Sequence, residues 1–331
     1  MPPVIAVVIP TKNRGEAVEK YALASLARSS FRDFMCVIWD ASDDELTSDL
    51  VKGRSWGFDI QYFKAPRKGL TSQRNDAVRH VLCAFPGVRY IIFMDDDCEF
   101  SENALAGALE TFQESGVLIV NIRMKPVAPF SFRSKVSLSL KRLLGMNRHG
   151  ATSFLYNYGG EDEAAGCEAE WANGGGMCVD VSVFRDMRVF FPEEFQLFGG
   201  YALGEDLAFS LYARRKLGVR IINSLYGHYL HYAAGSSRLN IQNMAASKWY
   251  NFHLLFDAIY EDGEQERPPK LRFKLFMMAA ALKLLVRARS LDLPSVLRGI
   301  SEARAALRRY RSENDISSLM RPRWDAGREV K

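Results

Sequence analysis

Long apolar segments and paired cysteines are both missing from this chain of 331 residues. No apolar run reaches the roughly 18–20 residues that a helix needs to cross a bilayer. The first residues also lack the cationic stretch followed by an apolar stretch that marks a signal peptide. The five cysteines form no CxxC pair and no metal-ligand spacing. These absences count against a membrane-spanning or disulfide-rich protein, and they predict a cytoplasmic protein with reduced thiols.

Basic residues are distributed unevenly along the chain. The whole sequence has 44 Lys and Arg against 39 Asp and Glu, yet residues 264–331 alone hold 16 basic against 8 acidic side chains. Hydrophobic residues make up 48% of the chain and charged residues 25%, as in a globular protein with a sizeable core. We therefore expect a folded body at residues 1–263 and a basic extension at residues 264–331. By charge alone, the extension suits anionic lipid, nucleic acid or solvent.

Short apolar runs alternate with segments of helical spacing. The apolar runs predict strands at residues 4–9, 35–39, 59–63, 90–94, 116–122, 177–183 and 219–222. The helical spacings predict helices at residues 15–29, 71–83, 104–112, 135–144, 205–217, 247–260, 271–290 and 295–312, with a long loop or insertion over residues 145–166. This alternation predicts an α/β fold, with a mostly parallel sheet flanked by helices and a helical C-terminal extension.

Polar residues follow three of the predicted strands directly. Pro10 and Thr11 close the first strand, Asp40 closes the second, and Asp95–Asp97 follow the strand at residues 90–94. Sheets of this kind bind ligands beyond the carboxyl ends of their strands. We therefore expect these three clusters to share one ligand-binding edge.

Two acidic clusters are candidates for chemistry. The adjacent carboxylates of Asp95–Asp97 repel one another and are costly to desolvate, so they suit Mg²⁺ or Mn²⁺ together with phosphate oxygens. The alternative is a solvated acidic turn or a helix N-cap. Glu205 and Asp206 open a predicted helix. They suit a general base, or else simple charge complementarity with the helix dipole.

Other polar groups are weaker candidates. The turn at residues 10–14 and the segment around Arg74 open predicted helices and are suited to holding a phosphate, unless they are ordinary turns. A triple glycine at residues 174–176 permits close approach of the backbone to a ligand. Lone histidines such as His228 and His231 are usually structural, but beside an acidic cluster either could complete a metal site.

In their order and spacing, these residues resemble the inverting family-two glycosyltransferases of bacterial type, which have the GT-A fold. The likeness covers roughly residues 4–232. The segments that carry it are residues 7–14, 37–44, 69–75, 95–97, 173–177 and 204–208. One departure is Trp39, which stands where the family usually has a small residue.

The resemblance implies a role for each segment. It assigns nucleotide binding to Pro10, Thr11, Asn13, Arg14, Asp40, Arg74, Asp95 and Asp96. It assigns the metal to Asp97 and Asp95, together with His228 or His231. It assigns the donor sugar and the acceptor to Trp171, Asn173, Gly174 and Gly175. It places Glu205 and Asp206 among the catalytic residues, with Asp206 as the base.

The implied activity is transfer of a sugar from a nucleotide diphosphate-sugar, most simply a UDP-sugar, to an acceptor hydroxyl. The reaction is a single displacement with inversion, and Mn²⁺ or Mg²⁺ is the cofactor. The resemblance also implies a GT-A catalytic domain at residues 1–263, with a nucleotide-binding half at 1–122 and an acceptor-side half at 123–263. The expected role is cell-surface polysaccharide or glycolipid assembly in the cytoplasm or at the inner face of the membrane, on a saccharide or lipid-linked acceptor.

Two other functions remain open at this point. A nucleotidyltransferase would use a similar α/β scaffold. That class has a glycine-rich loop directly after the first strand, where this chain has Gly15 alone. A non-catalytic carbohydrate- or nucleic-acid-binding protein is the second alternative. We do not expect nucleic acid as a partner, because aromatic residues such as Tyr310 and Trp324 are sparse in the basic tail. The basic helices there predict either contact with a membrane surface or packing on the body with a solvated basic face.

Overall fold

The computed structural model describes residues 3–125, 127, 165–199, 202–232, 241–260, 277–278 and 293–313. The helix expected at residues 135–144 lies outside the described residues. The same holds for the loop expected at 145–166 except its last two residues, and for the helix expected at 271–290 except residues 277–278, which are helical.

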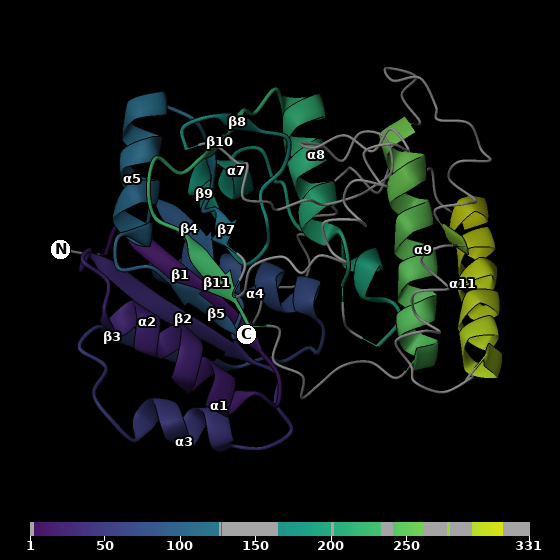
Figure 1. The fold of residues 1–331 in the computed structure, drawn as a ribbon, viewed down its shortest axis with the longest axis horizontal. Coiled ribbons are helices and arrows are strands. Elements are labelled where there is room, and N and C mark those ends of the chain that lie inside the picture. The colour runs from purple at the N-terminus through teal and green to yellow at the C-terminus, as the bar shows by residue number, and fades with distance from the viewer. Residues whose placement is uncertain are drawn as a thin grey trace.

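Four parallel strands form the N-terminal half of an eight-stranded sheet (Figure 1). They are β1 (Ile5–Thr11), β2 (Phe34–Asp40), β3 (Asp59–Lys64) and β4 (Tyr90–Phe93), and they lie in the order β3-β2-β1-β4. Every residue of β1 and β2 is buried. The continuous apolar runs therefore mark strands that are covered on both faces, as the sequence predicts.

The second half of the sheet is mixed. Strand β9 (Met177–Asp180) is antiparallel to both β4 and β6 (Ile119–Asn121), and the order continues with β10 (Ile221–Asn223) and β8 (Glu168–Ala169). The strand expected at residues 177–183 is wrong at its C-terminal end, because Val181–Arg185 form helix α7. The carboxylate of Asp180 accepts a hydrogen bond from Ser182 N at 2.9 Å, and this N-cap ends the strand and starts the helix.

Helices cover both faces of the sheet. Alternate residues of β1 point to opposite faces: Ile5 and Val7 belong to one core cluster, and Ala6 and Val8 to the other. The first face is covered by the helical segment at residues 15–27, formed by α1 (Gly15–Ala17), the π-helical turn η1 (Val18–Leu23) and α2 (Ala24–Ala27), and by α5 (Ala104–Ser115). The second face is covered by α4 (Leu70–Ala84), α7 and α8 (Glu205–Leu217). The predicted α/β architecture, with a sheet flanked by helices, is thus confirmed. A short peripheral helix, α3 (Leu46–Lys52), joins β2 to β3.

A small second sheet lies beside the main one. It contains β5 (Cys98–Phe100), β11 (Tyr229–His231) and β7 (Met124–Lys125) in the order β5-β11-β7. The antiparallel pairing of β11 with β5 places His231 opposite Cys98. A residue more than 130 positions along the chain is thereby brought next to the acidic triplet.

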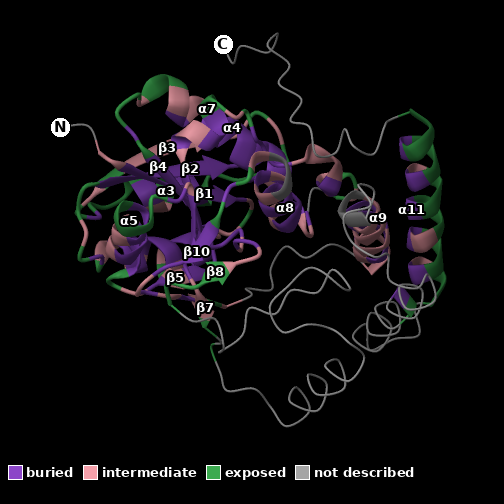
Figure 2. Cartoon of the chain, turned by 90° about the horizontal axis from the view of Figure 1, so that it is seen from above, coloured by how far each residue is buried: buried purple, intermediate pink, exposed green. Residues whose placement is uncertain are grey.

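Two long helices, α9 (Ile241–Tyr260) and α11 (Leu293–Glu313), pack side by side beyond α8 (Figure 1). The buried residues of α11 recur every three or four positions, at Val296, Gly299, Ala303, Leu307 and Tyr310. Its other face is exposed, as Figure 2 shows. The helices expected at residues 247–260 and 295–312 are confirmed, and each is longer in the structure than predicted. Among the described residues, no helix has the length and apolarity needed to cross a membrane.

Candidate active site

The carboxyl ends of β1 and β4 meet through side-chain contacts. Thr11 Oγ1 donates a hydrogen bond to Asp96 Oδ2 at 2.8 Å. The guanidinium of Arg14 pairs with Asp96 Oδ1 at 2.8 Å and also with Asp97. Thr11, Arg14 and the acidic triplet therefore come together at one edge, as predicted.

Asp96 and Asp97 have pKa shifts in opposite directions. Asp96 is 3% exposed, and this burial raises its pKa to about 7 although Arg14 opposes the effect. Burial also acts to raise the pKa of Asp97, but the hydrogen bond from His231 and the charges of His231 and Arg14 outweigh it, so that this pKa falls below its usual range. Asp97 is therefore the firmly ionised member of the pair.

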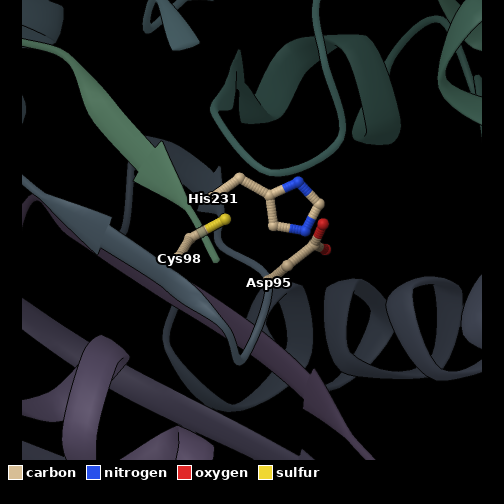
Figure 3. Close-up of side chains that lie close together, drawn as sticks. All are labelled: Asp95, Cys98 and His231. Carbon is tan, nitrogen blue, oxygen red and sulfur yellow. The ribbon is translucent and has the colours of Figure 1, made fainter. Parts of the chain in front are cut away.

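His231 is the histidine that reaches the acidic triplet. Its Nε2 lies 3.1 Å from Asp97 Oδ1. The potential ligand atoms of Asp95, Cys98 and His231 all lie within 4.8 Å of one another, and Figure 3 shows the three side chains converging. His228 belongs to a different environment, where burial and the charges of Lys125 and Arg123 lower its pKa. The sequence alone does not distinguish His231 from His228, and it does not identify Cys98. All three assignments depend on the pairing of β11 with β5, which places His231 opposite Cys98.

Arg74 lies at the centre of the site. Its side chain is 1% exposed, and its guanidinium pairs with Asp95 Oδ1 at 2.9 Å and with Glu205 Oε1 at 2.8 Å. It also donates a hydrogen bond to the carbonyl of Gly174 at 3.2 Å. The buried Arg74 guanidinium therefore joins the acidic triplet, the start of α8 and the glycine segment, which the sequence analysis treats separately.

Glu205 and Asp206 begin helix α8 and differ in their partners. Asp206 is half-buried, and its two carboxylate oxygens accept hydrogen bonds from Gly174 N at 2.9 Å and Leu207 N at 2.8 Å. Burial raises the pKa of Asp206. Burial, reinforced by the charge of Asp206, raises the pKa of Glu205 to about 7 against the opposing effect of Arg74. Asp206 is the more accessible carboxylate, whereas Glu205 is buried and forms an ion pair with Arg74.

The end of β2 contributes a second polar group. Asp40 is fully buried and accepts hydrogen bonds from Ser42 N at 2.7 Å and Tyr62 Oη at 2.8 Å. It pairs in register with Thr11 of β1. Gln73 of α4 donates to the carbonyls of Thr11 at 2.9 Å and Trp39 at 2.8 Å, which ties the two strand ends to the helix.

The turn after β1 is fixed to the turn after β2. Asn13 has a positive φ of 55°, and its backbone N–H donates to Ser42 Oγ at 2.6 Å. Pro10 lies beside Trp39 in the β1–β2 register. The sequence identified the β1 turn and Asp40, but it did not identify Ser42 and Gln73 as partners of that turn or Tyr62 as the partner of Asp40. Side-chain contacts between different loops leave no local signal.

The glycine segment lies against the centre of the site. The backbone N–H of Asn173 donates to Asn121 Oδ1 at 3.1 Å, and Asn173 Oδ1 accepts from Gly175 N at 3.3 Å. A Cβ on Gly175 would lie 3.1 Å from Cys98 Sγ and 3.2 Å from Asp95 Oδ2. A larger residue here would push these neighbours aside by a few tenths of an ångström, so the glycine packs closely against the acidic triplet.

Trp171 lies in a hydrophobic cluster and is 9% exposed. The cluster contains Phe195 from the turn η2 (Glu193–Gln196) and Leu207 of α8. The structure thus places Trp171 behind the glycine segment and not as an exposed aromatic platform. Its assignment to the acceptor remains a prediction.

Comparison with known proteins identifies the domain. Residues 6–159 match the family model described as Glycosyl transferase family 2. Residues 6–159 are thus similar to the family-two glycosyltransferases, and the chain has a GT-A-like fold. The resemblance and the enzyme class expected from the sequence are confirmed, and no curated protein matches the sequence.

Solved structures agree in fold. The mannosyltransferase PcManGT from Pyrobaculum calidifontis, in complex with GDP-Man and Mn²⁺, is 15% identical, with a TM-score of 0.52 over 97% of this chain and 79% of that one. S. aureus TarS 1–349 is 15% identical, with a TM-score of 0.51 over 96% and 89%. GalNAc-T7 with UDP, GalNAc and Mn²⁺ is 14% identical, with a TM-score of 0.52 over 86% and 58%. The chain spans 40% of the length of the longer TarS structure.

Proposed function

We propose that this glycosyltransferase is an inverting, metal-dependent enzyme with Asp206 as its catalytic base. The observation that carries the proposal is the division of the acidic groups into two sets. Asp95–Asp97 and His231 gather at the carboxyl end of β4, whereas Asp206 is held separately by two backbone N–H groups. One set suits a cation and a diphosphate, and the other suits proton transfer.

The donor set fits a divalent cation such as Mn²⁺ or Mg²⁺. Five carboxylates gather around Arg14, Arg74 and His231, from Asp95–Asp97 and from the pair Glu205–Asp206. A dication offsets part of this excess negative charge. Asp95 and His231, which cluster with Cys98, would hold it. Asp97, whose Oδ1 lies 3.1 Å from His231 Nε2, would be a further ligand. Mn²⁺ is present in the PcManGT and GalNAc-T7 structures. When bound, it stabilises the negative charge that develops on the departing diphosphate.

The chain's own groups account for the displacement. Asp206 takes the proton of the acceptor hydroxyl, and that oxygen attacks the anomeric carbon of the donor sugar. The bond from this carbon to the diphosphate oxygen breaks, and its electron pair leaves with the nucleoside diphosphate. Because attack and departure occur on opposite faces of one carbon, its configuration is inverted.

A nucleotide-sugar is the donor, and we propose a UDP-sugar. TarS 1–349 has been solved with UDP-GlcNAc and PcManGT with GDP-Man, so nucleotide-sugars are the shared ligand class. We assign the nucleotide to the edge formed by the β1 and β2 turns, with Pro10, Thr11, Asn13 and Asp40. Asn173, Gly174 and Gly175 face the donor sugar and the acceptor in this proposal.

We propose a saccharide or lipid-linked acceptor and a role in cell-surface polysaccharide or glycolipid assembly. Helix α11 supports membrane-surface contact, because Arg298, Arg308 and Arg309 lie on its exposed side. Arginines on a helix surface attract anionic lipid headgroups. The cytoplasmic, peripheral location and the basic extension at residues 264–331 belong to the same proposal.

The proposal is tested by calorimetric binding of a panel of nucleoside diphosphates, each with Mn²⁺ and with EDTA. We expect one nucleotide to bind in a Mn²⁺-dependent manner. Asp97→Ala removes a carboxylate that pairs with both Arg14 and His231, so it should weaken this binding about tenfold or more. Failure of every nucleotide to bind would contradict the proposal. Release of pyrophosphate in place of a nucleoside diphosphate would indicate nucleotidyl transfer.

A further inference from the structure

Arg74 bridges two acidic groups from separate elements. Asp95 follows β4, and Glu205 begins α8, more than 100 residues later. The guanidinium lies over the rings of Phe93 and Phe191, at 5.8 Å and 5.3 Å from their centroids. These rings and the 1% exposure leave the side chain little freedom to turn away from either carboxylate.

The same guanidinium also contacts the glycine that holds the base. Gly174 accepts a hydrogen bond from Arg74 through its carbonyl and donates one to Asp206 through its N–H. A Cβ on Gly174 would lie only 2.7 Å from the Arg74 guanidinium. A continuous set of contacts therefore runs from Asp95 through Arg74 and Gly174 to Asp206.

We propose that Arg74 is a positioning residue that couples occupancy of the cation and diphosphate side to the placement of Asp206. This inference rests on the proposed function, in which Asp95 faces the donor and Asp206 is the base. A planar guanidinium can hold two carboxylates and a carbonyl at once, whereas an ammonium is a single point of charge on a flexible stem. Arginine is therefore the side chain that this coupling requires.

Arg74→Lys tests this positioning role, because lysine keeps the positive charge but lacks the planar guanidinium that can bind several acceptors at once. We expect turnover at saturating donor to fall about tenfold or more, since small misplacements of a catalytic group are costly. Mn²⁺-dependent affinity for the nucleoside diphosphate should change less than about threefold, because a cation remains beside Asp95. If Arg74 acted mainly by contacting the donor, the variant would lose affinity for the nucleoside diphosphate and keep most of its turnover at saturating donor.

Arg67→Lys is a matched control. Arg67 also bridges two carboxylates, Asp76 at 2.6 Å and Glu193 at 2.7 Å, but away from the acidic triplet and α8. We expect this variant to keep wild-type turnover. If Arg74→Lys does not fold, Glu205→Gln replaces it, because it removes one carboxylate of the bridge with little change in shape.

Hydrogen exchange supplies a measurement that does not require turnover. Addition of the nucleoside diphosphate with Mn²⁺ should slow exchange at residues 202–210 in the wild type and in Arg67→Lys, but not in Arg74→Lys. If the nucleotide binds and these residues do not respond in the wild type, or respond equally in Arg74→Lys, the inference is overturned and the proposed function stands. If no nucleotide binds to the wild type, the inference and the proposed function are both contradicted.

Discussion

At the scale of single residues, burial and hydrogen bonding decide what each carboxylate can do. Asp97 is kept ionised by Arg14 and His231, whereas Asp96 is buried deeply enough for its pKa to rise to about 7. Glu205 is paired with Arg74, which leaves Asp206 as the half-buried acid that can meet a substrate hydroxyl. Neighbouring acids in the sequence thus have different chemistry because their surroundings differ.

Asp206→Asn should lower turnover by about 10²–10⁴-fold, the range typical of a lost general base. Nucleotide binding should persist, because the asparagine side chain keeps an oxygen that can accept one of the two backbone hydrogen bonds. Turnover is measured with the donor that the binding panel identifies. Asp186→Asn is the control, because Asp186 is an exposed residue that directly follows α7. Wild-type turnover in Asp206→Asn would contradict the assignment of the base.

The pH dependence of the wild type gives an independent check on Asp206. A base must be ionised to accept a proton, and burial raises the pKa of this carboxyl. Turnover should therefore rise with pH through a pKa above the ordinary aspartate value of about 3.9. A profile without an acid limb above that value would contradict the role.

At the scale of elements, close packing between helices accounts for the arrangement of the C-terminal part. Helix α11 lies against α9, and both share a hydrophobic cluster with α8 and η2 through residues such as Tyr250 and Leu307. The helix that carries Glu205 and Asp206 is thus supported from the side away from the sheet. The proposed boundary at residue 263 falls between two helices, α9 and α11, that pack together.

Gly299→Ala tests this packing. A Cβ at position 299 would lie 2.2 Å from the carbonyl oxygen of Gln242, so α11 would have to move away from α9. We expect a loss of about 1–3 kcal/mol in the free energy of unfolding, as for other overpacked contacts. Chemical denaturation measures this loss, with Ser301→Ala on the exposed side of α11 as the control. Equal stability of the two variants would contradict the close contact.

At the scale of the whole molecule, negative charge is concentrated at one edge of the sheet. The acidic triplet and the Glu205–Asp206 pair come from opposite halves of the chain, yet they face the same buried arginine. Burial raises the pKa values of Asp96 and Glu205, and the charges of neighbouring carboxylates add to this effect. A cation that binds only the folded state should therefore stabilise the entire protein.

Mn²⁺ should raise the free energy of unfolding by about 2.7 kcal/mol at a free concentration 100 times its dissociation constant. Thermal unfolding with Mn²⁺ and with EDTA measures the effect. His231→Ala should remove most of it, because this side chain belongs to the ligand cluster. His228→Ala is the matched control and should respond to Mn²⁺ like the wild type. Equal responses of the two histidine variants would contradict the assignment of His231.

The sequence by itself determined the alternation of strands and helices and the position of Asp40, Asp95–Asp97 and Asp206 at the ends of elements, because apolar periodicity and acidic clusters are local patterns. It also carried enough order and spacing to predict the family. Only the tertiary structure decided that His231 reaches the acidic triplet, that Arg74 joins both acidic groups, and that Trp171 is buried. These facts depend on pairing between distant segments, such as β5 with β11, and such pairing leaves no periodic trace in one chain.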